Sequence, residues 1–250
     1  MLVLALAAVV VGCGADDEEQ PAAQEDRPEL IVSAAASLSD ALTACSKQFE
    51  DATVRLSFAG SDELAAQIRQ GVKPDVYAAA NTRLPQELAQ EGLLGAPVEF
   101  ATNELVIAVG GDGTAVERVE DMAEPGIDLV IGAESVPVGA YTREVLGRLP
   151  DALEEQILAN VRSEEPDVKG VVGKITQGAA DAGFVYLTDV TEGLTGVELP
   201  PELRPSVAYG AGVVEGSEQP ELAQQYLDGL TEGPCADALR EEGFGTPPAG

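Results

Sequence analysis

Apolar and polar positions follow two periods along the chain, one typical of strands and one typical of helices. Short runs of Val, Ile, Leu and Ala predict buried strands, and segments whose apolar residues recur every three or four positions predict helices. In the first third of the 250-residue chain the two kinds of segment alternate. The predicted strands are 29–35, 53–59 and 75–80, and the predicted helices are 39–50, 62–70 and 84–92. Strand–helix–strand units of this spacing imply right-handed crossovers and a parallel sheet.

A second series of elements follows. Strands are predicted at 104–110, 127–133, 182–187 and 206–214, and helices at 140–149, 168–178, 221–230 and 235–242. The simplest arrangement is an α/β fold of two lobes, each a mostly parallel sheet flanked by helices. The strands 104–110 and 206–214 are long enough to run from one lobe to the other. We therefore expect a first lobe of residues 29–106 and 210–250 and a second of residues 107–209. A single large sheet is the alternative that periodicity leaves open.

The N-terminus has the pattern of an export and anchoring segment. Residues 1–12 are apolar throughout, which is too short to span a bilayer but suits a secretory signal. The motif VVGC at Val10–Cys13 resembles a bacterial lipobox, in which the Cys is acylated; the alternative is a Cys that follows an apolar run by chance. Residues 13–28 are rich in carboxylates and predict a disordered acidic tether. We expect an extracytoplasmic lipoprotein, anchored through Cys13 on the outer face of the cell membrane.

Composition narrows the possible partners. The net charge is −30, from 44 acidic and 14 basic residues, which argues against nucleic acid or an anionic membrane face as a partner. A small anionic ligand is not excluded, because surface charges are screened beyond about 10 Å at ordinary ionic strength. The sequence contains no His, the commonest general base, which weakens most enzyme interpretations. Besides Cys13, the chain has Cys45 and Cys235, which form either one disulfide or two separately buried thiols.

Four segments share one local pattern, in which a strand ends in small residues and a helix begins. They are 34–40, 59–65, 135–144 and 164–170. Ser37 and Asp40 have the spacing of a capping box, and Asp167 can cap the fourth helix. A helix N-terminus offers unpaired N–H groups and a partial positive charge, so several that converge could hold an anion. Taken singly, each segment is equally consistent with an ordinary helix cap.

The motifs in these segments resemble those of a known family. They are AAASL at 34–38, SFAGSDELA at 57–65, PDVYAAA at 74–80, SVPVGAY at 135–141, PDVKG at 166–170 and DAGFVY at 181–186. Their order and spacing are similar to those of the periplasmic molybdate-binding proteins, from about Leu30 to Phe244. The resemblance implies two lobes that close over molybdate or tungstate, and docking of the closed form on an ABC permease in the membrane. It also implies a monomer without enzymatic activity and without a cofactor.

The resemblance further implies a set of oxyanion ligands. Ser37 and Ser61 would each donate a hydroxyl and a backbone N–H, Val138 and Val168 a backbone N–H each, and Tyr186 its phenol hydroxyl. These groups would bind the oxygen atoms of the ion, so no side chain would be a direct metal ligand. Relatives often carry Ser at the position of Gly60 and Ala at that of Val138. We expect these differences to remove one neighbouring hydroxyl and to adjust the pocket size.

Other functions remain open. A binding protein for another tetrahedral oxyanion, such as sulfate or thiosulfate, is the main alternative. An enzyme with Ser37 or Ser61 as nucleophile would need a Lys or carboxylate base, and neither serine lies in a GxSxG or SxxK motif. A structural envelope lipoprotein would respond to no ligand. Arg143 and Lys169 lie beside the motifs, and we expect both on solvated helix faces; an electrostatic contribution from behind the ligand residues is the alternative.

Overall fold

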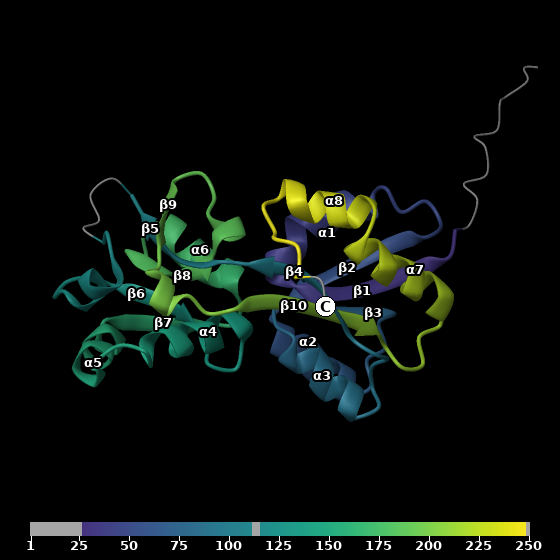
Figure 1. Cartoon of the computed structure of the whole chain (residues 1–250), viewed down its shortest axis with the longest axis horizontal. Helices are drawn as coiled ribbons and strands as arrows, with labels where there is room; N and C mark the ends of the chain where they lie inside the picture. Colours follow the sequence, from purple (N-terminus) through teal and green to yellow (C-terminus); the bar gives the residue numbers. More distant parts are fainter. Residues whose placement is uncertain (1–26, 112–115, 249–250) are drawn as a thin grey trace, which may run out of the picture.

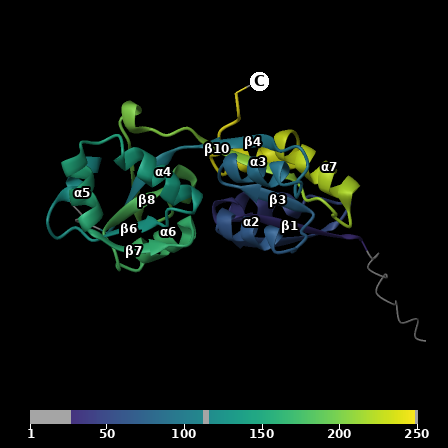
Figure 2. The same ribbon diagram turned by 90° about the horizontal axis from the view of Figure 1, so that it is seen from below.

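The computed structural model of the chain describes residues 27–111 and 116–248. In this part of the chain, Figures 1 and 2 show two α/β lobes side by side, each built on a five-stranded sheet. The two-lobed α/β fold predicted from the sequence is confirmed. The predicted signal segment, Cys13 and most of the predicted tether lie outside the described residues. Within the described residues, no helix is both long and apolar enough to cross a membrane.

The first sheet has the strand order β2-β1-β3-β10-β4. Its strands are β1 (Glu29–Ala35), β2 (Thr53–Ala59), β3 (Val76–Ala79), β4 (Val98–Asn103) and β10 (Val207–Val213). Strands β2, β1 and β3 pair in parallel, while β10 pairs antiparallel with both β3 and β4. Four strands therefore run in one direction and β10 alone is reversed.

The second sheet repeats this pattern with the order β7-β6-β8-β5-β9. Its strands are β5 (Leu105–Gly110), β6 (Leu129–Gly132), β7 (Val161–Glu165), β8 (Ala182–Tyr186) and β9 (Leu194–Glu198). Strand β5 is reversed, pairing antiparallel with β8 and β9, while β7, β6 and β8 are parallel. The lobes exchange their reversed strands, because β5 follows β4 directly into the second sheet and β10 returns to the first. Each sheet is thus mostly parallel in strand direction, as expected.

Helices cover both faces of the first sheet (Figure 1). One face carries α1 (Ser39–Ser46), α7 (Pro220–Thr231) and α8 (Pro234–Glu241), and the other α2 (Ser61–Arg69) and α3 (Arg83–Gln90). Side chains alternate across β3 accordingly: Val76 and Ala78 belong to one apolar cluster, and Tyr77 and Ala79 to the other. The second sheet is flanked by α4 (Pro137–Leu146), α5 (Asp151–Ala159) and α6 (Val168–Thr176).

The sheet topology moves the expected lobe boundaries. Strands β5 and β10 do not run between the lobes, because each lies wholly within one sheet. The chain crosses at Glu104, between β4 and β5, and again over residues 199–206, between β9 and β10. The expected boundaries at 106/107 and 209/210 therefore fall inside these strands. The expected helix 39–50 is also shorter in the structure, since α1 ends at Ser46.

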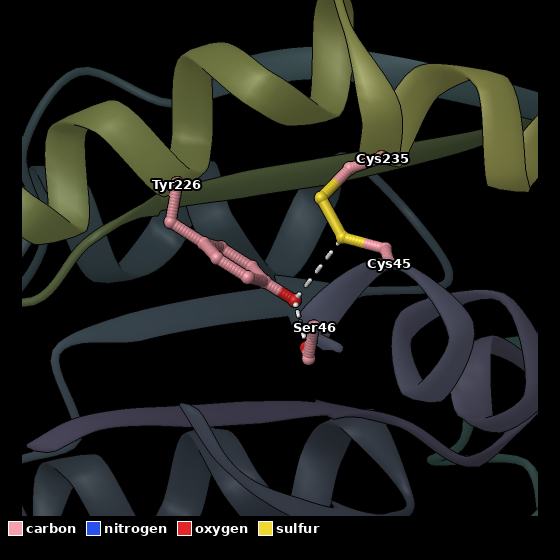
Figure 3. Close-up of a disulfide and its surroundings, with 4 residues drawn as sticks. All are labelled: Cys45, Ser46, Tyr226 and Cys235. Carbon is pink, nitrogen blue, oxygen red and sulfur yellow. Dashed lines mark hydrogen bonds between the residues drawn. A yellow bond between two sulfur atoms is a disulfide. The ribbon is translucent and has the colours of Figure 1, made fainter. Parts of the chain in front are cut away.

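A disulfide joins Cys45 of α1 to Cys235 of α8, with 4.6 Å between the Cα atoms (Figure 3). Both residues are buried, and they are separated by 190 positions in the sequence. The Tyr226 hydroxyl lies beside the bridge, 3.1 Å from Ser46 Oγ and 3.9 Å from Cys45 Sγ (Figure 3). The bridge ties the C-terminal helices, which follow the second lobe in sequence, onto the first lobe.

Candidate functional site

Four helix starts meet between the lobes, two from each sheet. In the first lobe they follow β1 and β2, and in the second they follow β6 and β7. These are the first two parallel strands of each lobe, so corresponding connections approach each other from the two sides. All four lie at the carboxyl ends of parallel strands, where ligands of open α/β sheets usually bind.

The four starts line a small cavity with a free volume of about 20 Å³. Its lining comes from both lobes: Ala35, Ala36, Ser37, Ala59, Gly60, Ser61, Ala80, Val136, Pro137, Val138, Asp167, Val168 and Tyr186. All five expected ligand residues lie in this lining. The volume is below the roughly 300–1,000 Å³ of pockets for drug-sized ligands, which indicates a small ligand.

Ser61 is held in place by two hydrogen bonds. It is the first residue of α2 and is 1% exposed. The Tyr77 hydroxyl donates to the Ser61 carbonyl oxygen at 2.7 Å, which anchors the start of the helix. The Ala80 N–H donates to Ser61 Oγ at 3.1 Å. Because its oxygen already accepts a hydrogen bond, the Ser61 hydroxyl can direct its own proton to a ligand.

Ser37 has a similar environment. It lies in the 3-10 turn Ala36–Leu38 between β1 and α1, and the Tyr209 hydroxyl donates to its Oγ at 3.2 Å. The capping box expected from Ser37 and Asp40 does not form, because α1 has no side-chain cap and Asp40 pairs with Lys169 instead. Ser37 therefore lies in the cavity wall as an acceptor from Tyr209, with its own proton left for another partner.

The second lobe contributes the first turns of two helices. Val138 follows Pro137, which occupies the first position of α4 and has no N–H to offer. A side chain on Gly139 would collide with the Ala133 carbonyl oxygen, so glycine lets α4 start close to the end of β6. Val168 is the first residue of α6, after the N-cap residue Asp167, whose Oδ1 accepts the Gly170 N–H at 2.9 Å. The predicted cap at Asp167 is thus present.

Tyr186 is the last residue of β8, is 1% exposed and lines the cavity. Its ring packs edge-on against Tyr141 and Tyr209, with centroids 6.4 and 5.8 Å away. Its hydroxyl is buried and has no hydrogen-bond partner among the described residues. Burial raises the pKa of this phenol well above its usual value, so the hydroxyl keeps its proton. An unpaired buried hydroxyl costs about 1–3 kcal/mol of stability. A ligand that accepts a hydrogen bond from this hydroxyl would recover that free energy.

Charged side chains surround the cavity but barely line it. Among the described residues, Asp167 is the single charged residue in the lining, and its Oδ1 is engaged in the cap of α6. Arg143 pairs with Glu164 at 2.6 Å. In the part of the chain that the structure describes, no cluster of His, Cys, Asp or Glu side chains could hold a metal ion. The site therefore offers neutral hydrogen-bond donors and no basic side chain.

Lys169 is not the solvated residue that the sequence suggested. From α6 of the second lobe, its Nζ lies 3.0 Å from Asp189 Oδ1 and 3.2 Å from Asp40 Oδ2 of the first lobe. Asp189 is fully buried, and burial raises the pKa of its carboxyl from 3.8 to about 6, although Lys169 acts in the opposite direction. One ammonium group thus bridges a carboxylate from each lobe.

Glycine at position 60 has a larger effect than the loss of the serine hydroxyl that relatives carry there. A side chain at this position would collide with the carbonyl oxygen of Pro166, which belongs to the opposite lobe. Its backbone, at φ −59° and ψ 136°, is open to any residue, so the constraint comes from the neighbouring lobe and not from Gly60's own conformation. The expectation that this substitution affects only a neighbouring group is therefore too narrow, because glycine lets the two lobes approach.

Residues 30–245 match the family model of the bacterial extracellular solute-binding proteins. The chain belongs to this family. One relative is the molybdate-binding protein ModA of Mycobacterium tuberculosis, 36% identical in an alignment of 256 positions that covers 97% of this chain and 95% of that protein. The family resemblance found in the sequence motifs is confirmed. Membership makes the chain a bacterial extracellular solute-binding protein.

Two solved structures share the architecture. The periplasmic molybdate-binding protein of Azotobacter vinelandii has a TM-score of 0.78 at 21% identity, covering 88% of this chain and 100% of that one. The sulfate-binding protein SubI of Mycobacterium tuberculosis has a TM-score of 0.74 at 14% identity, covering 87% and 86%. At such identities the likeness shows the fold alone, which is the two-lobed α/β fold of these periplasmic binding proteins.

Sequence reasoning missed the residues that support the five expected ligands. Ala80 and Tyr209 orient the two serine hydroxyls, and Lys169, held by Asp189 within the second lobe, pairs with Asp40 of the first lobe. Tyr209 is 172 positions from Ser37, and no local pattern signals a contact at that separation. The four helix starts and the family resemblance of their motifs were the signals that pointed to this region.

Proposed function

We propose that this chain is the solute-binding component of an ABC importer and captures molybdate or tungstate between its lobes. The proposed ligands are the hydroxyl and backbone N–H groups of Ser37 and Ser61, the N–H groups of Val138 and Val168, and the Tyr186 hydroxyl. In the same proposal the chain is a monomer, its closed form docks on a membrane permease, and Cys13 carries the lipid anchor.

The observation that carries the proposal is the unpaired, buried hydroxyl of Tyr186 in a cavity whose two serines already accept hydrogen bonds. All three hydroxyls are oriented to donate a hydrogen bond into the cavity. The helix starts add backbone N–H donors and a partial positive charge. Each hydrogen bond to a charged acceptor contributes about 1.5–3 kcal/mol. A small dianion with oxygen atoms on every side fits such a lining without a basic side chain.

The choice of molybdate over other tetrahedral dianions rests on relatives. The mycobacterial protein named for molybdate binding is 36% identical over nearly the whole chain, whereas the sulfate-binding structure is only 14% identical. Sulfate or thiosulfate is the second candidate, because it has the same charge and also needs donors only. Hydrogen phosphate carries a proton that needs an acceptor, and among the described residues the lining offers one carboxylate, Asp167, whose Oδ1 is used by the Gly170 N–H so that only Oδ2 is left to accept it.

Thermal unfolding in the presence of molybdate, tungstate, sulfate and phosphate tests the proposal. A ligand at a hundred times its dissociation constant stabilises the fold by about 2.7 kcal/mol. The chain contains no Trp, so calorimetry or an external dye reports the transition. We expect a shift with molybdate and tungstate and none with phosphate. A shift with sulfate alone would replace the ligand, and no shift with any oxyanion would contradict the proposal.

Three substitutions in the wall sharpen this test. Ser37→Ala, Ser61→Ala and Tyr186→Phe each remove one donor and should each weaken molybdate binding about 10- to 150-fold. Ser33→Ala is the matched control, because Ser33 is a buried serine of the same sheet outside the cavity lining. Equal losses in the control and the wall variants would show that the effect is not local to the cavity.

The lipid anchor is tested separately by mass spectrometry of the N-terminal peptide from the membrane fraction. Acylation of Cys13 as the first residue is expected. An unmodified Cys13, or a mature N-terminus upstream of it, would contradict the anchor and leave the binding proposal intact.

A further inference from the structure

A chain of polar side chains leads from the first crossing between the lobes to the cavity wall. Asn103, the last residue of β4, donates from Nδ2 to the Tyr209 hydroxyl at 3.4 Å. The Tyr209 hydroxyl then donates to Ser37 Oγ at 3.2 Å. Tyr209 and Ser37 are both buried, so water does not compete for these groups.

The direction of the chain is set at its outer end. The backbone N–H of Glu104 donates to Asn103 Oδ1 at 2.8 Å, which identifies that atom as the amide oxygen. The amide nitrogen therefore faces Thr188 Oγ1, at 2.9 Å, and the Tyr209 hydroxyl. Since an amide nitrogen only donates, Tyr209 accepts from Asn103 and has its single proton left for Ser37.

We propose that Tyr209 is a positioning residue that commits the Ser37 hydroxyl to donate into the cavity, and that Asn103 sets the direction of this relay. The inference rests on the proposed function, because the oxyanion is the ligand that accepts the hydrogen bond from the Ser37 hydroxyl. A hydroxyl whose orientation is already fixed loses less freedom when the ligand arrives. Ser37 is also a poorer acceptor for the proton of hydrogen phosphate, so the relay contributes to selection of fully deprotonated ions.

The surroundings of Tyr209 allow its hydroxyl to be tested apart from its ring. The ring packs edge-on against Phe100, Tyr186 and Phe244, with centroids 5.4 to 6.1 Å away. Phenylalanine keeps these contacts and removes only the hydroxyl. Burial, and after it the Asp189 carboxylate, raises the pKa of Tyr209 well above its usual value, so the wild-type relay keeps its proton at ordinary pH.

The test is a double-mutant cycle on the dissociation constant for molybdate, measured by titration calorimetry with the full chain. Tyr209→Phe should raise the constant about 2- to 12-fold, the range of one neutral hydrogen bond. In a Ser37→Ala background the same change should have no further effect, because the group it orients is gone. Independent losses in the two variants would overturn the relay, because Tyr209 would then not act through Ser37.

Tyr226→Phe is the matched control. Tyr226 is also fully buried, and its hydroxyl lies 3.1 Å from Ser46 Oγ beside the disulfide, away from the cavity lining. It should lower the unfolding midpoint about as much as Tyr209→Phe and leave molybdate binding unchanged. A comparable change in binding in the control would reduce the Tyr209 effect to general destabilisation and overturn the inference.

Selectivity supplies a readout that a structural role would not move. In Tyr209→Phe the Ser37 oxygen loses its donor and can accept, so the ratio of the phosphate to the molybdate dissociation constant should fall. An unchanged ratio together with unchanged molybdate binding would overturn the inference while the proposed function stands. Failure of the wild-type chain to bind any tetrahedral oxyanion would overturn both.

Asn103→Asp keeps the test decisive if Tyr209→Phe does not fold. A carboxylate accepts from the Tyr209 hydroxyl and withdraws that proton from Ser37, so molybdate binding should weaken. The new negative charge weakens molybdate binding by itself, and this share of the loss in affinity persists in a Ser37→Ala background. The inference requires an additional loss of affinity that is present with Ser37 and disappears in the Ser37→Ala background. If Asn103→Asp weakens binding equally in both backgrounds, the relay is contradicted.

Discussion

At the scale of single residues, the cavity owes its character to the way each hydroxyl is supported from behind. Ser61 Oγ accepts from Ala80, Ser37 Oγ accepts from Tyr209, and Tyr186 has no partner among the described residues. Each of these side chains therefore has a proton to offer towards the same space. Neutral donors held in this way can bind a dianion in a chain whose net charge is −30.

Gly60→Ala separates closure of the lobes from stability of the fold. The new methyl group collides with the Pro166 carbonyl of the opposite lobe, so the lobes should stay further apart and molybdate binding should weaken by about 10-fold or more. The backbone at Gly60 accepts Ala, so the ligand-free protein should be equally stable or up to about 1 kcal/mol more stable. Calorimetry and chemical denaturation measure the two quantities. Wild-type affinity in this variant would show that closure does not depend on Gly60.

Asp189→Asn tests the buried carboxylate by its pH dependence. The charged and titratable groups around it are Lys169, Asp40, Asp167, Tyr186 and Tyr209. Because its folded-state pKa is raised to about 6, its contribution to stability is present below pH 3.8 and is lost as the pH rises through 6. Asparagine does not titrate. The stability of the variant relative to wild type should therefore increase by about 2 kcal/mol between pH 4 and pH 7. A difference that stays constant over this range in urea unfolding would contradict the assignment.

At the scale of elements, what the sequence predicted depended on burial. Strands β1, β3, β5, β6, β8 and β10 were expected because each carries a run of apolar residues, and the edge strand β2 because its apolar residues alternate with polar ones. The helices after β1, β2 and β7 were expected from their period. The missed strands β4, β7 and β9 all lie at sheet edges, where polar residues such as those of VRSEE at 161–165 are tolerated. The apolar pattern of the sequence does not reveal strands of this kind.

Only the residues that line the cavity could be predicted from the sequence, and the residues that support them from behind could not. The four helix starts have local signals, namely small residues after a strand and an N-cap such as Asp167. The supporting contacts join residues far apart in sequence, as Tyr209 and Ser37 are, and they follow from the exchange of β5 and β10 between the lobes. That exchange is a property of the topology, and no single segment encodes it.

The link between α1 and α8 has a predictable energetic role. Because Cys45 and Cys235 are 190 positions apart, their bridge closes a long loop and restricts the unfolded chain. The double variant Cys45→Ser/Cys235→Ser should lose about 2–5 kcal/mol of stability in urea unfolding. Neither residue lines the cavity, so molybdate binding by the folded fraction should not change. A stable variant that no longer binds would place the bridge in the ligand site and contradict this separation.

At the scale of the whole molecule, the ligand site belongs to neither lobe alone. The cavity wall contains residues from both sheets, Lys169 pairs with a carboxylate from each lobe, and Asn103 bonds Thr188 across the first crossing. Bringing the lobes together therefore assembles the donors and removes water from them, which strengthens each electrostatic contact. In the proposed function, ligand binding and lobe closure are therefore one event.

The central claim is that neutral donors from both lobes bind a tetrahedral dianion. The most direct measurement is a calorimetric titration of molybdate at low and high ionic strength into the wild-type chain and the Ser37→Ala/Ser61→Ala variant. We predict one saturable site in the wild type, with an affinity that changes little with salt because no Lys or Arg lines the cavity. The variant, with one donor missing from each of two first-lobe starts, should bind at least about 100-fold more weakly. Binding that persists in the variant, or that disappears at high salt, would place the anion on basic surface groups and contradict the account.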